Sequence, residues 1–194
     1  MERYRIIRML MAVSVILLLA ACGESKLKDP LNWEVEQFSY TDQNGKTFGS
    51  SDLQKKVWIA DFIFTSCETV CPPMTANMTK LQKMLKEKGI KDVEFVSFSV
   101  DPTVDTPEKL QEFMKKYEMD ASKWHFLTGY SQEEISQFAE KNFKALVDKP
   151  ASTTQVIHGT SLYLVDTTGT VVKKYSALQN TPYEDIIKDI QTIR

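Results

Sequence analysis

The chain has few of the side chains that bind soft metals or react as nucleophiles: its 194 residues include only three cysteines and two histidines. Thiol and imidazole chemistry is therefore confined to Cys22, Cys67, Cys71, His125 and His158. Cys22 ends an apolar N-terminal run and has a separate explanation, given below. The pair formed by Cys67 and Cys71 is therefore the most informative feature of the remaining chain.

Arginine is almost absent after residue 21, where Arg194 is the only one. Thiol peroxidases use one cysteine activated by nearby polar groups, often an arginine, so the sequence disfavours that class. No basic block is interleaved with aromatic residues, and nucleic acid is therefore not an expected partner. Without residues 1–21, which hold three arginines and one glutamate, the chain has 21 basic and 25 acidic residues, a net charge of −4.

The first 21 residues have the pattern of a bacterial signal peptide. A basic start precedes the apolar run 6–21, which is too short to favour a permanent membrane span. The run ends in Leu-Ala-Ala-Cys, which is similar to a lipobox, where the cysteine is lipidated and becomes the new N-terminus. We therefore expect Cys22 to carry a lipid that anchors the protein on the extracytoplasmic face of the cell membrane, where disulfides persist. An uncleaved anchor with an incidental Cys22 is the alternative.

The rest of the chain has the length of one domain. Residues 22–32 are expected to be the lipidated N-terminus and a polar tether, and residues 33–194 the folded domain. An Asn-Gly pair at 44–45, between strand-like segments at 35–40 and 46–48, predicts a hairpin. Strands are then predicted at 57–64, 93–100, 125–127, 161–165 and 171–175, and helices from near Pro72 to Gly89 and around 110–117, 135–139 and 186–193. This order predicts an α/β, thioredoxin-like fold with a central mixed sheet, helices on both faces and an N-terminal β-hairpin extension.

Cys67 and Cys71 lie between the first of these strands and a helix, where α/β sheets place their sites. Prolines at 72 and 73 suit a first helical turn, so both thiols lie near the positive helix end, which favours thiolate. A helical turn would separate their Cβ atoms by about 5–6 Å, against about 3.8 Å in a disulfide. The pair is a redox couple or a metal clamp, with Cu(I) favoured and zinc as its competitor. An inert disulfide is a third alternative, although so short a loop gains little from closure.

Two sulfurs rarely complete a metal site, so a third ligand is expected. His158 ends the non-periodic segment 142–159, and its position suits a ligand and a structural residue equally well. His125 lies in an aromatic run and is interpreted as structural. Met74 and Met78 are soft potential ligands, but their helical spacing predicts core packing.

Two acidic residues lie near the expected site. Asp61 interrupts an apolar strand six residues before Cys67, and either accepts a proton from a thiol or pairs with Lys55 or Lys56. Asp101 ends the next strand, and either orients the site and tunes cysteine reactivity or starts a turn with the proline that follows it.

Taken together, four motifs resemble the Sco/SenC family of copper-binding, membrane-anchored proteins with a thioredoxin fold. They are CETVCP at 67–72, DPTVDTP at 101–107, WHFLTG at 124–129 and HGT at 158–160. The resemblance implies that Cys67, Cys71 and His158 bind copper, either as Cu(I) or as Cu(II). It also implies a role in assembling the binuclear CuA centre of cytochrome c oxidase subunit II, which would be the partner. Many relatives have a transmembrane helix, whereas a lipid anchor is expected here.

Two functions follow from this pattern. The first is a metallochaperone that delivers copper, which is a monomeric binding protein and not an enzyme. The second is a thiol–disulfide oxidoreductase that reduces the cysteines of the CuA site before the metal arrives. A pure oxidoreductase needs no distant histidine, so the presence of His158 favours the metallochaperone. The place of His158 on a loop suggests that its side chain swings away while copper is transferred.

Overall fold

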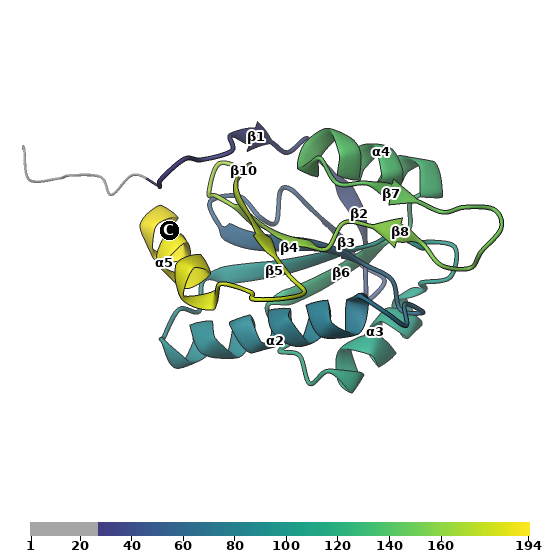
Figure 1. Ribbon diagram of the computed structural model, residues 1–194, viewed down its shortest axis with the longest axis horizontal. Helices are drawn as coiled ribbons and strands as arrows, with labels where there is room; N and C mark the ends of the chain where they lie inside the picture. Colours follow the sequence, from purple (N-terminus) through teal and green to yellow (C-terminus); the bar gives the residue numbers. More distant parts are fainter. Residues whose placement is uncertain (1–26) are drawn as a thin grey trace, which may run out of the picture.

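The computed structural model describes residues 27–194 (Figure 1). The predicted signal peptide and the lipidation site Cys22 lie outside the described residues. Within the described part, no helix combines the length and the apolar character that a membrane crossing requires.

An eight-stranded mixed sheet forms the centre of the protein, in the order β1-β10-β9-β4-β5-β6-β2-β3. Neighbours β4, β5 and β6 are parallel, and the other pairs are antiparallel. The strands are β1 (Trp33–Glu34), β2 (Ser39–Asp42), β3 (Thr47–Gly49), β4 (Val57–Ile63), β5 (Val93–Ser99), β6 (Trp124–Thr128), β9 (Ser161–Val165) and β10 (Thr170–Ser176). A separate two-stranded ladder joins β7 (Val147–Asp148) to β8 (Ile157–His158).

Helices cover both faces of this sheet. They are α2 (Cys71–Glu87), α3 (Pro107–Lys116), α4 (Gln132–Phe143) and α5 (Tyr183–Ile193). Helices α2 and α3 lie on one face and α4 on the other (Figure 1). Helix α5 is joined to α2 by a hydrogen bond from the Tyr183 hydroxyl to Asn77 Oδ1. The predicted mixed sheet with helices on both faces is confirmed.

Burial on both faces explains why the central strands are mostly apolar. Every residue of β4 and of β5 is buried, as expected for parallel strands between helix layers. Aromatic rings fill the layer under α4: Phe143 lies 5.4 Å from Phe62 and 5.9 Å from Phe98, between ring centroids. The same layer supports the carboxyl ends of β4 and β5, where the cysteines are.

The N-terminal hairpin is present but shorter than predicted at its start. The strand expected from residue 35 begins only at Ser39, because earlier N–H groups bond to side chains. Glu36 donates to Asn142 Oδ1 and Phe38 donates to Ser50 Oγ. The Asn-Gly turn is confirmed, with Gly45 at a φ of +70°.

Two short pairings were not predicted. Strands β1, β7 and β8 have two residues each, too few to produce a periodic pattern. Leu31, inside the expected tether, donates its N–H to Val172 O at 3.0 Å, so the chain is already bound to the sheet two residues before the predicted domain start. The non-periodic segment 142–159 contains the β7–β8 ladder, which carries His158.

A buried carboxylate, Glu94, lies at the start of β5, the end of the sheet opposite to the cysteines. Its side chain is 4% exposed and contacts Lys56 Nζ at 3.1 Å, Lys123 Nζ at 3.0 Å and His125 Nε2 at 3.5 Å. Burial by itself would raise the pKa of Glu94, but the contacts with His125, Lys123 and Lys56 outweigh it and lower the pKa to about 2.

Glu94→Gln removes the charge that pairs with the two lysines, so we expect the free energy of unfolding at pH 7 to fall by about 1–2 kcal/mol. The loss is no larger because both lysines are partly exposed and solvent screens their charges. The folded-state pKa lies below the unfolded value, so this contribution is present above about pH 4.5 and is lost as the pH falls towards 2. Urea unfolding from pH 7 to pH 3 checks the prediction. The exposed Glu87→Gln is the control, and a difference that stays constant with pH would contradict the assignment.

Candidate metal centre

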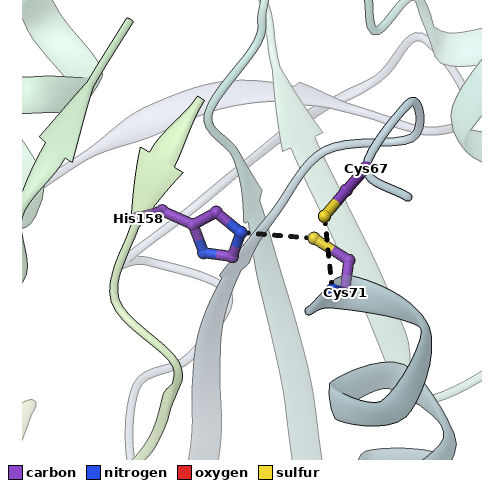
Figure 2. Close-up of side chains that lie close together, drawn as sticks. All are labelled: Cys67, Cys71 and His158. Carbon is purple, nitrogen blue, oxygen red and sulfur yellow. Dashed lines mark hydrogen bonds between the residues drawn. The ribbon is translucent and has the colours of Figure 1, made fainter. Parts of the chain in front are cut away.

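Two cysteines and one histidine from distant parts of the chain meet at one point (Figure 2). Cys67 lies in the turn after β4, Cys71 is the first residue of α2, and His158 ends β8. Their sulfur and nitrogen ligand atoms all lie within 4.8 Å of one another. Cys71 is fully buried, Cys67 is 8% exposed, and both thiols are free.

Local structure explains where the two sulfurs lie. Prolines at 72 and 73 lie in the first turn of α2, so the helix cannot extend back to Cys67, which ends a separate turn closed by a hydrogen bond from its N–H to Phe64 O at 3.3 Å. The N–H of Cys71, free at the helix start, donates to Cys67 Sγ at 3.3 Å. The expected placement of both thiols at the helix N-terminus is confirmed.

The imidazole of His158 is oriented towards the sulfurs. Its Nδ1 lies 2.9 Å from its neighbour's carbonyl, Gly159 O. A carbonyl oxygen can only accept, so Nδ1 carries the proton and Nε2 presents its lone pair. That Nε2 lies 3.3 Å from Cys71 Sγ (Figure 2). The ring edge of His158 also packs near Phe64, with centroids 5.7 Å apart.

The two thiols differ strongly in acidity. The pKa of Cys67 is lowered to about 3, chiefly by the hydrogen bond from Cys71 and also by the N–H groups of Cys71 and Thr69, which outweigh the effect of burial. The same hydrogen bond, followed by burial, raises the pKa of Cys71 well above its usual range. Cys67 is therefore a thiolate at neutral pH. A bound cation would draw the second proton off Cys71, because metal coordination deprotonates thiols.

These three residues fit one soft metal ion. Sulfur and nitrogen ligands at about 2.0–2.3 Å from a metal lie about 4 Å from each other, a spacing compatible with the observed cluster. Two free sulfurs this close can also form a disulfide after a small movement. The geometry thus supports both kinds of chemistry that the sequence suggests for Cys67 and Cys71.

Asp61 lies beneath the site but does not pair with a lysine. It is 1% exposed and accepts a hydrogen bond from Ser97 Oγ at 2.6 Å, whereas Lys56 pairs with Glu94. The predicted alternative of an ion pair with Lys55 or Lys56 is therefore wrong, because both lysines precede β4 and Asp61 lies deep within it. Burial raises the pKa of Asp61 to about 7.

The polar partners of Asp101 do not include the two cysteines or His158. Its backbone carbonyl accepts hydrogen bonds from the N–H groups of Val104 and Asp105, so the predicted turn is confirmed. Its carboxylate, 1% exposed, accepts from Thr103 and forms an ion pair with Lys149. Through Lys149, the carboxylate of Asp101 is joined to the segment that carries His158.

No role for Asp105 is predicted from the sequence, although in the structure it anchors the start of the cysteine turn. Its fully buried carboxylate accepts from the N–H and hydroxyl groups of Thr65 and from Ser99 Oγ. Thr65 is two residues before Cys67, so this network fixes where the turn leaves β4. The only available signal was the spacing of two acids, Asp101 and Asp105, directly after a buried strand.

The remaining candidates are structural. His125 stacks on Phe48, with centroids 3.8 Å apart, and contacts Glu94 far from the cysteines. Met74 and Met78 are fully buried in the core. The structural interpretation of these three residues is confirmed.

Comparison with known proteins identifies the family. A family model described as SCO1/SenC matches residues 29–194. The chain is 52% identical over 188 residues to the SCO1 protein homolog of Bacillus subtilis, covering 97% of both chains. This chain belongs to the SCO1/SenC family. The predicted thioredoxin-like fold class is therefore confirmed, because the solved structures of the family share it.

Two solved Sco structures are informative. One is BsSco, described as a member of the Sco family of cytochrome c oxidase assembly proteins, in which a disulfide switch was identified. It is 54% identical to this chain, with a TM-score of 0.80, and the match covers 86% of this chain and 96% of that one. The other is Arabidopsis thaliana ScoI with copper bound, 29% identical, with a TM-score of 0.68 and coverage of 80% and 97%.

Proposed function

We propose that this protein is a copper-binding assembly factor that delivers copper to, or prepares, the CuA site of cytochrome c oxidase subunit II. The observation that carries the proposal is the convergence of Cys67, Cys71 and His158, with their ligand atoms within 4.8 Å of one another. The copper-bound Arabidopsis relative and the description of BsSco as an oxidase assembly protein support it.

The donor set favours copper over zinc. Structural zinc sites are closed by four protein ligands, whereas the described residues bring together only Cys67, Cys71 and His158. Two thiolates and one imidazole suit Cu(I), and the imidazole also suits Cu(II). A three-ligand site leaves a position at which an incoming ligand from subunit II competes for the metal.

A thiol–disulfide reductase is the second candidate, because Cys67 is a ready thiolate beside a second free thiol. In this reaction Cys67 attacks a partner disulfide, whose S–S bond breaks and releases one partner thiol after protonation. Cys71 then attacks Cys67 in the mixed disulfide and releases the second thiol. The partner gains two electrons and two protons, and the disulfide between Cys67 and Cys71 forms.

We also propose that the protein acts as a monomer on the extracytoplasmic face of the cell membrane, anchored by a lipid on Cys22. The lipobox-like end of the apolar N-terminal run supports this location. Mass spectrometry of the N-terminal peptide from membranes tests the anchor: a diacylated or triacylated Cys22 is expected, and a retained residue 1–21 segment would contradict it.

Anaerobic titration of the reduced protein in detergent with copper tests the function. We expect binding to saturate at one equivalent, with a thiolate-to-copper charge-transfer band when Cu(II) is added. The band should disappear in Cys67→Ser and in Cys71→Ser, while Met74→Leu, which alters a soft side chain in the core, should keep it. A band that survives the loss of either cysteine would contradict the proposed ligands.

A further inference from the structure

The residue His158 is carried by a projecting segment, here called the arm, which comprises residues 147–158. Strands β7 and β8 form its base, and the intervening loop extends beyond the end of the sheet (Figure 1). Two residue pairs, Val147 with His158 and Asp148 with Ile157, and one flanking hydrogen bond from the Gly159 N–H to Leu146 O hold its two sides together. So short a ladder is not stable by itself in water. The position of His158 must therefore depend on contacts between the arm and the rest of the domain.

The strongest polar contact of the arm is an ion pair. Lys149 Nζ binds Asp101 Oδ1 and also lies 3.3 Å from Thr103 Oγ1. The Asp101 side chain is 1% exposed and the Lys149 side chain 25% exposed. A nearly buried carboxylate loses its hydration, so it strongly favours a cation beside it. A second, weaker contact joins Gln155 Nε2 to Ser66 O at 3.4 Å.

The acidic partner of this ion pair belongs to the rigid part of the site. The N–H of Asp101 donates to Ser99 Oγ, and Ser99 donates to Asp105, which holds Thr65 before the cysteine turn. Lys149, by contrast, is on the arm, nine residues before His158. The ion pair thus joins the scaffold of the two cysteines to the segment that carries the histidine.

We infer that the ion pair between Lys149 and Asp101 is a clasp that keeps the arm closed, and that its opening lets His158 leave the thiols. Lys149 is a positioning residue: it touches neither the sulfurs nor the imidazole, and acts by limiting the movement of the arm. Asp101 is held to Ser99 at the end of β5, whereas the partly exposed Lys149 can move into solvent. The clasp should make the arm less mobile and should slow the loss of bound copper. The second of these effects rests on the proposed function, whereas the first does not.

The first test measures the arm in the reduced, metal-free protein. Hydrogen exchange of the amides of residues 149–158 should be about five-fold faster or more in Lys149→Met, which keeps the alkyl stem and loses the charge. Lys149→Arg should restore slow exchange, and Lys46→Met, a change on the exposed hairpin turn, should match the wild type. Added salt should speed exchange in the wild type and have little effect in Lys149→Met. Equal exchange in Lys149→Met and the wild type would overturn the clasp.

The second test measures release of copper from the loaded protein to a chelator. Loss of copper should also be about five-fold faster or more in Lys149→Met, with normal loss in Lys149→Arg and Lys46→Met. Faster arm exchange with unchanged copper release would overturn the link between the clasp and metal retention. A wild-type protein that binds no copper would contradict the proposed function, while the exchange experiment would still decide whether the clasp exists.

Discussion

Replacing His158 with alanine should weaken copper binding by more than about 100-fold while changing the rate of thiol–disulfide exchange only a few-fold. Loss of a residue that merely supports a metal ligand typically costs 10–100-fold in affinity, and His158 presents its Nε2 lone pair directly to the cluster. The two cysteines keep their turn, their helix start and their mutual hydrogen bond in this variant. Copper affinity measured by competition with a chelator, and the rate of reduction of a small disulfide, check the two parts separately.

The His158→Ala variant also discriminates between the two proposed functions. If the protein is a metallochaperone, a strain that expresses His158→Ala should lose CuA assembly as fully as one without the protein. If it is only a reductase, that strain should assemble the centre normally. His125→Ala is the matched control, because this ring stacks on Phe48 at the far end of the sheet. It should reduce stability and leave copper affinity unchanged, and an equal loss of affinity in both variants would contradict the special role of His158.

Periodicity predicts the fold of this chain well because its central elements are long and uniform. Residues 57–63 and 93–99 are buried along their whole length, and their β-branched and aromatic residues indicate strands despite polar positions such as Asp61 and Glu94. The prolines at 72 and 107 mark helix starts that the structure confirms. Short pairings such as β7 with β8 could not be predicted, since two residues have no period and their partners are set by tertiary contacts.

The candidate site was only partly predictable for the same physical reason. Cys67 and Cys71 are close in sequence, so local geometry alone brings them near each other. His158 reaches them through folding of the whole domain, and only the family resemblance connected it with the pair. The connection between Lys149 and Asp101 spans 48 positions, and no local pattern of charge indicates that these two residues are neighbours.

The role of Asp105 shows how one buried carboxylate joins stability to the geometry of the site. Its two oxygens accept from three donors: the Thr65 N–H, which they share, the Thr65 hydroxyl and the Ser99 hydroxyl. Burial raises its pKa, and the bonds from Ser99 and Thr65 partly offset this effect. Such a network restricts the start of the cysteine turn, because every donor at this buried position depends on the same acceptor.

We therefore expect Asp105→Ala to lower the free energy of unfolding by about 3 kcal/mol or more, because it leaves buried donors without an acceptor. Asp105→Asn should fall between the wild type and Asp105→Ala, since it keeps one acceptor oxygen and a similar shape. Under conditions where both variants are folded, copper affinity should fall in the same order, because Thr65 no longer fixes the path to Cys67. Urea unfolding and chelator competition measure the two effects, with the exposed Asp185→Ala as the control. A stable Asp105→Ala protein with wild-type copper affinity would show that the turn of Cys67 is fixed by the helix start alone.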